Sequence, residues 1–317
     1  MLTILLTTVP FFALVLCGYI AARQGVLSPA AIPGLNTFVL YFALPCMLYR
    51  FGAGTPIAQL LDPAILGVYL ASALFMIFVT VLATRSHRIG WNDAAFGALV
   101  AAFPNTGYMG VPLLVALFGA QATGPAILTI AIDLVFTSSI CVALSRLGTG
   151  GTDGARAAFG NAFKGMVANP MPWAIVLGGV ASALGFVLPT PIGQTLGLLA
   201  DAASPVALFT IGAVLARSQM TTTDRTPLAE YVPVALKKLV LHPLVVWLIG
   251  TAAIALGAPL SPFALTVIVL VAALPSASNV AMLAERFKAD SGRIARVILV
   301  STAVAFVTFS AAVSLLV

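Results

Sequence analysis

The chain reads FPNTGYMGVP from Phe103 to Pro112, in the middle of an otherwise apolar stretch. This sequence places two prolines, two glycines and an asparagine where a continuous helix would be expected. An interior proline costs a helix about 3 kcal/mol and a glycine about 1 kcal/mol. In lipid, such a break is tolerated only where the freed backbone groups find partners in protein or in a water-filled cavity. The motif therefore predicts an interrupted helix that lines a ligand site at membrane depth.

The composition predicts an all-α, polytopic membrane protein. Apolar residues make up 61% of the 317 positions and charged residues 8%, against about 45 to 50% and about 25% in a soluble domain. About 20 apolar residues cross a hydrocarbon core of ~30 Å. Segments of this kind predict ten transmembrane helices, at residues 3–22, 35–53, 63–83, 94–118, 124–145, 170–187, 195–216, 231–256, 264–284 and 294–316.

The basic residues predict how the chain is oriented. Fourteen of the fifteen Lys and Arg residues fall in alternate loops, among them Arg156, Lys164 and Arg225, and only Arg50 does not. Cytoplasmic loops are enriched in Lys and Arg, so both termini are expected outside the cytoplasm of a plasma (inner) membrane. The net charge of +6 is then a topology signal, and we expect no nucleic-acid partner. Arg50 is expected to reach the outer interface, with attraction of an anion from the outer vestibule as the alternative, and Asp201 is expected to cap a helix there.

The two halves of the chain resemble each other. A shift of 160 positions places Gly18 on Gly178, and a larger shift places Phe103-Pro104-Asn105 on Leu274-Pro275-Ser276. The ninth helix is therefore expected to break where the fourth does. The predicted organisation is a first five-helix repeat at 1–145, a cytoplasmic linker at 146–169 and a second five-helix repeat at 170–317.

Five helices are an odd number, so the second repeat must enter the membrane in the opposite orientation. Inverted repeats with paired broken helices are typical of secondary transporters, whose substrate lies near the membrane midplane. The N-terminal ends of the half-helices present free amide donors and partial positive charge. The sequence therefore predicts an anion site where the fourth and ninth helices cross, between Pro104 and Pro275.

Three motifs resemble the auxin efflux carrier family. They are Phe103-Pro104-Asn105-Thr106 followed by Met109-Gly110-Val111-Pro112, then Phe42-Ala43-Leu44-Pro45 after Asn36, and Ala272-Ala273-Leu274-Pro275 before Asn279. The resemblance implies the ten-helix fold of bile-acid sodium symporters, with a scaffold of helices 1, 2, 6 and 7. Helices 3 to 5 and 8 to 10 would form a mobile transport unit, and a homodimer would form through the scaffold. By the same resemblance, Asn105 would contact a substrate carboxylate. The long cytoplasmic loop of many plant carriers is absent, which favours a compact prokaryotic carrier.

The candidate substrate-binding residues surround the two predicted breaks. Asparagine amides can bind a ligand or cap a half-helix, and both readings stay open for Asn105 and Asn279. Small hydroxyl residues also serve ordinary helix packing. The full set of candidates is Pro104, Asn105, Thr106, Gly107, Tyr108, Pro275, Ser276, Ser278 and Asn279.

Two ionisable residues are candidates for ion coupling. Asp133 lies near the membrane centre, where an ionised carboxylate costs on the order of 2.5 to 3.5 kcal/mol. It is expected either to exchange a proton or to make a structural hydrogen bond. His242 can exchange protons near neutral pH, or can satisfy the backbone of a helix bent at Pro243. Lys237 and Lys238 are expected to extend to the membrane interface.

We expect a secondary active transporter of a small organic anion that works by an elevator-type alternating-access mechanism. The sequence has no nucleophile with a paired base, no phosphate-binding loop and no metal-ligand spacing around its three cysteines, so an enzyme, a metal and a bound cofactor are not expected. The coupling ion, H⁺ or Na⁺, stays open. The alternatives are a sodium-coupled symporter and a membrane sensor with the same fold. Small dicarboxylates, monocarboxylates and indole-type acids all stay open as substrates.

Overall fold

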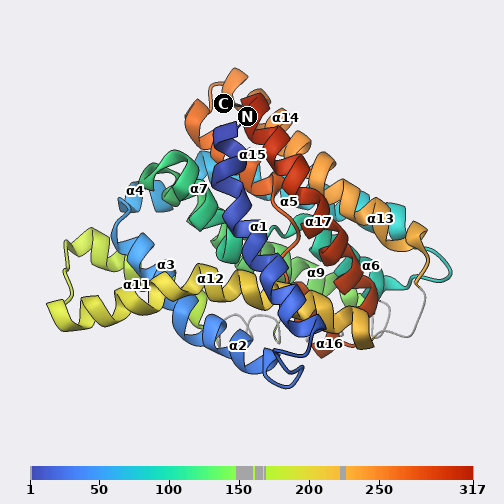
Figure 1. The fold of residues 1–317 in the computed structure, drawn as a ribbon. Coiled ribbons are helices and arrows are strands. Elements are labelled where there is room, and N and C mark those ends of the chain that lie inside the picture. The colour runs from blue at the N-terminus through green and yellow to red at the C-terminus, as the bar shows by residue number, and fades with distance from the viewer. Residues whose placement is uncertain (1, 148–159, 161–166, 168, 222–225, 317) are drawn as a thin grey trace. The chain divides into compact units, whose positions relative to one another are not determined.

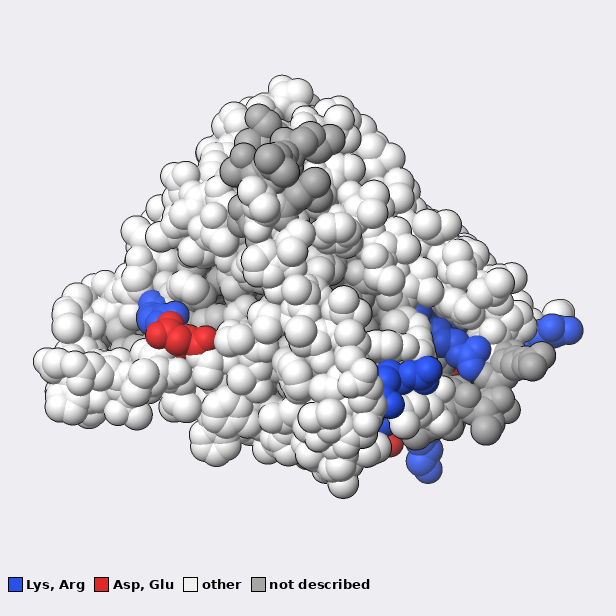
Figure 2. All heavy atoms as spheres, in the orientation of Figure 1, with Lys and Arg blue, Asp and Glu red and all other residues white. Residues whose placement is uncertain are grey.

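The computed structural model describes residues 2–147, 160, 167, 169–221 and 226–316, and within these ranges nearly every residue is helical. Among the described residues, six helical segments are long and apolar enough to cross a membrane. Most of the visible face in Figure 2 is uncharged, with Lys and Arg gathered mainly at its lower right. The protein is thus a multi-pass membrane protein. The six segments are Ile32–Ala53, Ile57–Thr84, Ala120–Ser145, Thr190–Met220, Leu228–Ala255 and Ser291–Leu316.

Four shorter apolar helices accompany these spans, at Thr8–Arg23, Thr106–Phe118, Pro170–Leu184 and Pro262–Ala273. The ten-helix inverted repeat and the orientation of the termini stay predictions. Most of the expected linker at 146–169 lies outside the described residues, as do Arg156, Lys164 and Arg225, which entered the orientation argument.

The chain divides into two compact units, each assembled from both halves of the sequence. The first unit comprises Met1–Asp62, Thr106–Ala131 and Asn169–Thr223. Its α-helices are α1 (Leu2–Arg23), α2 (Ile32–Phe38), α3 (Leu44–Ala53), α4 (Ile57–Leu60), α7 (Val111–Phe118), most of α8 (Thr123–Ile132), α11 (Pro170–Leu184) and α12 (Thr190–Thr221), and its short turns are η1 (Val39–Ala43), η2 (Thr106–Gly110) and η3 (Ala120–Ala122).

Glycines allow two close helix crossings in the first unit (Figure 1). A Cβ on Gly18 of α1 would overlap the carbonyl oxygen of Phe209 in α12. A Cβ on Gly178 of α11 would lie 2.6 Å from the carbonyl oxygen of Tyr49 in α3. Small residues at such contacts let membrane helices approach backbone to backbone, where dispersion contacts replace the hydrophobic effect as the driving force.

The second unit comprises Pro63–Asn105, Ile132–Ala168 and Asp224–Val317. It holds α5 (Pro63–Thr84), α6 (Trp91–Ala102), η4 (Asp133–Thr137), α9 (Ser138–Ser145), α13 (Leu228–Leu236), η5 (Lys237–Leu241), α14 (His242–Ala255), α15 (Pro262–Ala273), α16 (Asn279–Arg286) and α17 (Ser291–Leu316). Helices α6 and α15 are buried along nearly their whole length. They form the core of this unit, which explains why α6 from Ala94 onward and most of α15 are apolar on every face.

Polar contacts fasten one end of the second unit. The Asn92 amide at the start of α6 donates to the carbonyl oxygens of Phe287 and Lys288, between α16 and α17. Arg293 of α17 is almost fully buried, and its guanidinium donates to the carbonyl oxygens of Asp93 (3.2 Å) and Glu230 (3.0 Å). These contacts join α6, α13, α16 and α17 at a single end of the unit.

Candidate substrate and coupling sites

The two interrupted helices of the second unit pair with each other at their breaks. Helix α6 ends at Ala102 and α15 ends at Ala273, and in each case the next residue has an extended backbone. Pro104 and Ser276 then form an antiparallel bridge. The Asn105 N–H donates to the Pro275 carbonyl at 2.8 Å, and the Ala277 N–H donates to the Phe103 carbonyl at 3.0 Å. Both interruptions therefore lie where the sequence predicts them.

Side chains satisfy the carbonyl groups that these breaks leave free. In a continuous helix, Val100 would accept from residue 104, but Pro104 has no N–H. The Val100 carbonyl accepts instead from the Ser276 hydroxyl at 2.7 Å. Ala272 would accept from the Ser276 N–H, which donates to Ser301. The Ala272 carbonyl accepts instead from the Lys238 ammonium, a cation at the negative end of a helix.

The amides of Asn105 and Asn279 flank the paired breaks and do not cap a helix. Asn105 is 3% exposed, and its side chain makes no hydrogen bond to the residues that the structure describes. The Asn279 Oδ1 is likewise buried without a partner. A buried amide without a partner costs about 1 to 3 kcal/mol. Neither side chain caps a helix among the described residues, and contact of the two amides with a substrate stays a prediction.

The other predicted contact residues lie next to these asparagines in sequence. Thr106, Gly107 and Tyr108 belong to η2, a single π-helical turn of the first unit. Among them, the Thr106 and Tyr108 hydroxyls are buried without a partner. In the second unit, Ser278 is half-buried and Ser276 already donates to Val100. Turns of π-helix are frequent at functional sites, but the assignment of these residues to a substrate stays a prediction.

Asp133 is fully buried and accepts two hydrogen bonds. The Tyr69 hydroxyl of α5 donates to its Oδ2 at 3.1 Å, and the Thr137 hydroxyl donates to its Oδ1 at 2.9 Å. Asp133 and Thr137 are the first and last residues of η4, which is also a π-helical turn. Each carboxylate oxygen thus has one hydroxyl partner. Hydroxyls can either donate or accept, so the same pair can accommodate a charged or a protonated Asp133.

Lys238 and His242 lie close to this carboxylate group. The Lys238 Nζ is 3.2 Å from the His242 Nδ1, and the His242 ring lies against the Tyr69 ring with centroids 6.0 Å apart. Both Lys238 and His242 are fully buried. The His242 Nε2 has no partner in the described part of the chain. We name Tyr69, Asp133, Thr137, Lys238 and His242 the polar cluster.

The prediction that Lys238 extends to the interface is wrong. Its ammonium is held inside the second unit by Ala272 and His242, because the break after α15 offers it a free carbonyl. Lys237, its neighbour, is half-buried. Sequence reasoning also missed Tyr69, whose contact with Asp133 spans 64 positions. The inward position of Lys238 could have been inferred from the sequence, because Lys238 and His242 are one helical turn apart.

Arg50 and Asp201 form an ion pair in the first unit, with Nη1 and Oδ1 2.7 Å apart. The sequence predicts that Arg50 reaches the outer interface and that Asp201 caps a helix there. Helices α3 and α12 pack against each other and bring the two charges together. Asp201 lies inside α12 and caps no helix end, which corrects that expectation. The position of Arg50 at the interface stays a prediction, since its side chain is 40% exposed. The described residues contain no group of three or more His, Cys, Asp or Glu side chains that could hold a metal ion.

A family of membrane transporters matches nearly the whole chain. The model of the family described as "Membrane transport protein" covers residues 3–147 and 156–313. The chain belongs to this family. Relatives that match it over most of their length are named transporters, so the protein is a membrane transporter and not an enzyme.

Individual relatives agree with this membership. The "Putative malonate transporter" of Rhizobium meliloti is 29% identical over 302 residues, covering 94% of this chain and 91% of that protein. The "Uncharacterized transporter YfdV" of Escherichia coli is 27% identical over 290 residues, covering 88% and 86%. "Auxin efflux carrier component 7" of Arabidopsis thaliana is 30% identical over 121 residues, 37% of this chain and 19% of that protein. The resemblance to auxin efflux carriers is therefore confirmed.

Proposed function

We propose that this transporter is a secondary carrier of a small organic anion, and that its substrate binds at the paired breaks of α6 and α15. The observation that carries the proposal is the Asn105 side chain, which is buried at the crossing and makes no hydrogen bond to the described residues. An amide can donate two hydrogen bonds to a carboxylate. The malonate named for a relative makes a small dicarboxylate the first substrate to test.

The proposed architecture is ten helices in two inverted repeats. Six spans and four shorter apolar helices supply the number. The glycine crossings support the repeat. A shift of 160 positions places Gly18 on Gly178 and Tyr49 on Phe209. Gly18 contacts Phe209 and Gly178 contacts Tyr49, so each glycine meets the equivalent residue of the other half. In the proposed elevator mechanism, the third to fifth and eighth to tenth transmembrane helices predicted from the sequence form the transport unit. This unit moves against a scaffold of the first, second, sixth and seventh predicted transmembrane helices. A homodimer through the scaffold also stays a prediction.

We further propose that transport is coupled to protons through Asp133 and not to sodium. In many secondary transporters, the C-terminal carbonyl groups of broken half-helices coordinate the coupling ion. Here the Ala272 carbonyl at that end of α15 accepts from the Lys238 ammonium, which already supplies a positive charge. Asp133, with its two hydroxyl partners, is the carboxylate of the same unit that is suited to bind and release a proton.

The sodium-coupled symporter is the nearest alternative. It predicts that flux depends on a sodium gradient at constant pH. The proton-coupled carrier predicts that flux depends on a pH gradient at constant sodium concentration. A membrane sensor would bind the anion without moving it. Uptake into proteoliposomes, measured with sodium and pH gradients imposed separately, distinguishes all three.

The substrate site is tested by thermal unfolding with and without organic acids, using two asparagine variants as a matched pair. Asn105→Ala should keep the unfolding temperature of the free protein and lose the stabilisation by substrate, because its amide makes no hydrogen bond to the described residues. Asn92→Ala should lower the unfolding temperature of the free protein and keep the stabilisation by substrate, because the Asn92 amide holds the turn between α16 and α17. An Asn105→Ala protein that is stabilised by the acid and transports it like the wild type would overturn the assignment.

A further inference from the structure

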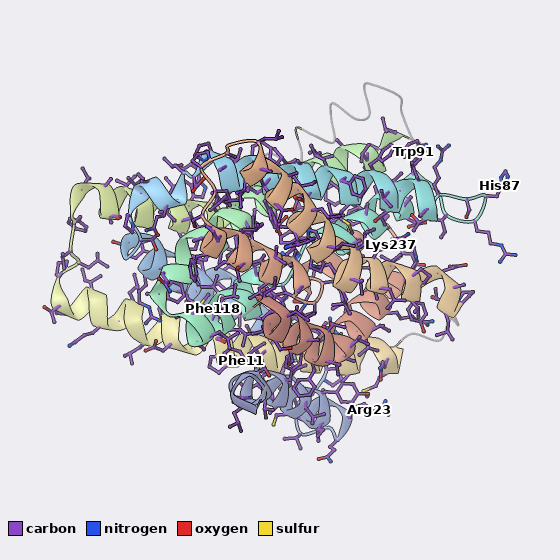
Figure 3. The ribbon with its side chains drawn as sticks, turned by 90° about the horizontal axis from the view of Figure 1, so that it is seen from above. Phe11, Arg23, His87, Trp91, Phe118 and Lys237 are labelled. Atoms are coloured by element: carbon purple, nitrogen blue, oxygen red, sulfur yellow. The ribbon has the colours of Figure 1, made fainter. Side chains whose placement is uncertain are left out.

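The turn between α5 and α6 carries basic side chains in a fixed arrangement. Helix α5 ends at Thr84 and α6 begins at Trp91, and residues that connect two membrane helices are expected at a membrane surface. The Ser86 hydroxyl accepts hydrogen bonds from the N–H groups of Arg88 and Ile89, and the Ser86 N–H donates to the Ile89 carbonyl. The turn therefore has a defined conformation that holds its side chains outward. Figure 3 shows His87 projecting from it beyond the helices.

The arginines of this turn have no acidic partner. Arg85 and Arg88 are exposed, and neither forms an ion pair with the residues that the structure describes. The Arg85 guanidinium lies over the Trp91 ring at 4.3 Å from its centroid. Trp side chains concentrate at membrane–water interfaces. The stacked pair leaves the edge of the guanidinium, with its N–H donors, free for an anion at that depth.

An exposed apolar stripe continues from Arg85 into the membrane. Phe75, Phe78 and Leu82 lie on the face of α5 that ends at Arg85, with spacings of three, four and three residues. Phe78 is 63% exposed and Leu82 is 65% exposed. At 1.5 Å per residue, the stripe from Phe75 to Arg85 is about 15 Å long, which is half of a ~30 Å hydrocarbon core. An acyl chain of one leaflet has this reach.

We propose that this surface binds an anionic phospholipid. Its phosphate would accept hydrogen bonds from Arg85 and Arg88, and its acyl chains would lie along Phe75, Phe78 and Leu82. A zwitterionic lipid fits less well, because its ammonium group would lie beside two unpaired arginines. The surface is separate from the paired breaks, so lipid binding does not depend on the identity of the transported anion.

The fluorescence of Trp91 reports on this surface directly. The chain has three tryptophans, and Trp173 and Trp247 are exposed and can be replaced by Phe to leave Trp91 alone. The protein is reconstituted into vesicles of phosphatidylcholine that contain equal fractions of brominated phosphatidylglycerol or brominated phosphatidylcholine. We expect stronger quenching by the brominated phosphatidylglycerol. An arginine near an anionic membrane surface contributes about 1 kcal/mol, or about fivefold in relative affinity.

Variants separate the proposed site from general attraction to a charged surface. Arg85→Gln with Arg88→Gln should bring quenching by phosphatidylglycerol down to the phosphatidylcholine level. Arg286→Gln, which removes an exposed arginine from the end of α16, should leave the preference intact. Equal quenching by both lipids in the parent protein, or an unchanged preference in the double variant, would overturn the proposal. Loss of the preference on adding inorganic phosphate at constant ionic strength would also overturn it, since the site would then bind a soluble anion.

Discussion

Gly18 and Gly178 occupy matching positions in two helix crossings of the first unit. Each lies against a backbone carbonyl of the helix that it crosses, Gly18 against Phe209 and Gly178 against Tyr49. One shift of 160 positions relates both the glycines and the residues that they contact. Such a relationship is expected if two copies of an ancestral unit exchanged helices. The two equivalent helix contacts therefore agree with the predicted repeat.

The crossing at Gly18 should not tolerate a methyl group. In Gly18→Ala, the new Cβ would overlap the Phe209 carbonyl, and we expect a loss of roughly 1 to 3 kcal/mol because the backbone must shift. Gly197→Ala is the matched control, because its Cβ would meet nothing within 4 Å and it also lies in a helix, α12. Thermal unfolding in detergent measures both. A Gly18→Ala protein as stable as the control would contradict the close crossing.

Asp133→Asn should uncouple transport from the proton gradient. The amide keeps the shape of the carboxylate and an oxygen for Tyr69 or Thr137, but it cannot bind and release a proton at physiological pH. We expect accumulation driven by a pH gradient to disappear while substrate exchange across the vesicle membrane continues. Exchange and driven uptake are measured in the same proteoliposomes. Driven uptake that persists in this variant would exclude Asp133 as the coupling residue.

Lys238→Met should destabilise the protein more than Lys237→Met. The first change leaves the Ala272 carbonyl without its donor, and an unsatisfied buried carbonyl costs about 1 to 3 kcal/mol. Lys237→Met makes the same replacement at the neighbouring lysine, which is only half-buried. Thermal unfolding of the two variants is compared at one pH and salt concentration. Equal stabilities would mean that the Lys238 contact contributes nothing at the break.

Lys288→Gly should stabilise the turn between α16 and α17. Lys288 has a φ of 57°, a left-handed conformation that costs a non-glycine residue about 1 to 2 kcal/mol. Glycine removes this strain. Its greater conformational freedom in the unfolded chain offsets about 0.4 to 1 kcal/mol of the gain, so only part of the strain energy appears as added stability. Lys288→Ala is the control, because alanine keeps the Cβ and the strain. A rise in the unfolding temperature for the glycine variant alone is expected, and the same rise in both variants would argue against strain.

The sequence alone predicted the membrane class, the family resemblance and both helix breaks. Composition determines the class because only apolar segments remain stable in lipid. Proline determines the breaks because Pro104 and Pro275 lack a backbone donor wherever the chain places them. Of the candidate residues, Asn105 and Asn279 could be selected because a polar amide beside a break is uncommon in so apolar a chain.

Only the tertiary structure decided which groups satisfy the breaks and which charges meet. Lys238 and Arg50 each read as a cation near a helix end, and a long side chain of this kind can extend to the interface or turn inward. Lys238 turns inward to a partner far away in sequence, the Ala272 carbonyl, and Arg50 stays partly exposed and pairs with the distant Asp201. The same holds for Tyr69 and Asp133. A local pattern cannot report such contacts, because they arise from the packing of separate helices.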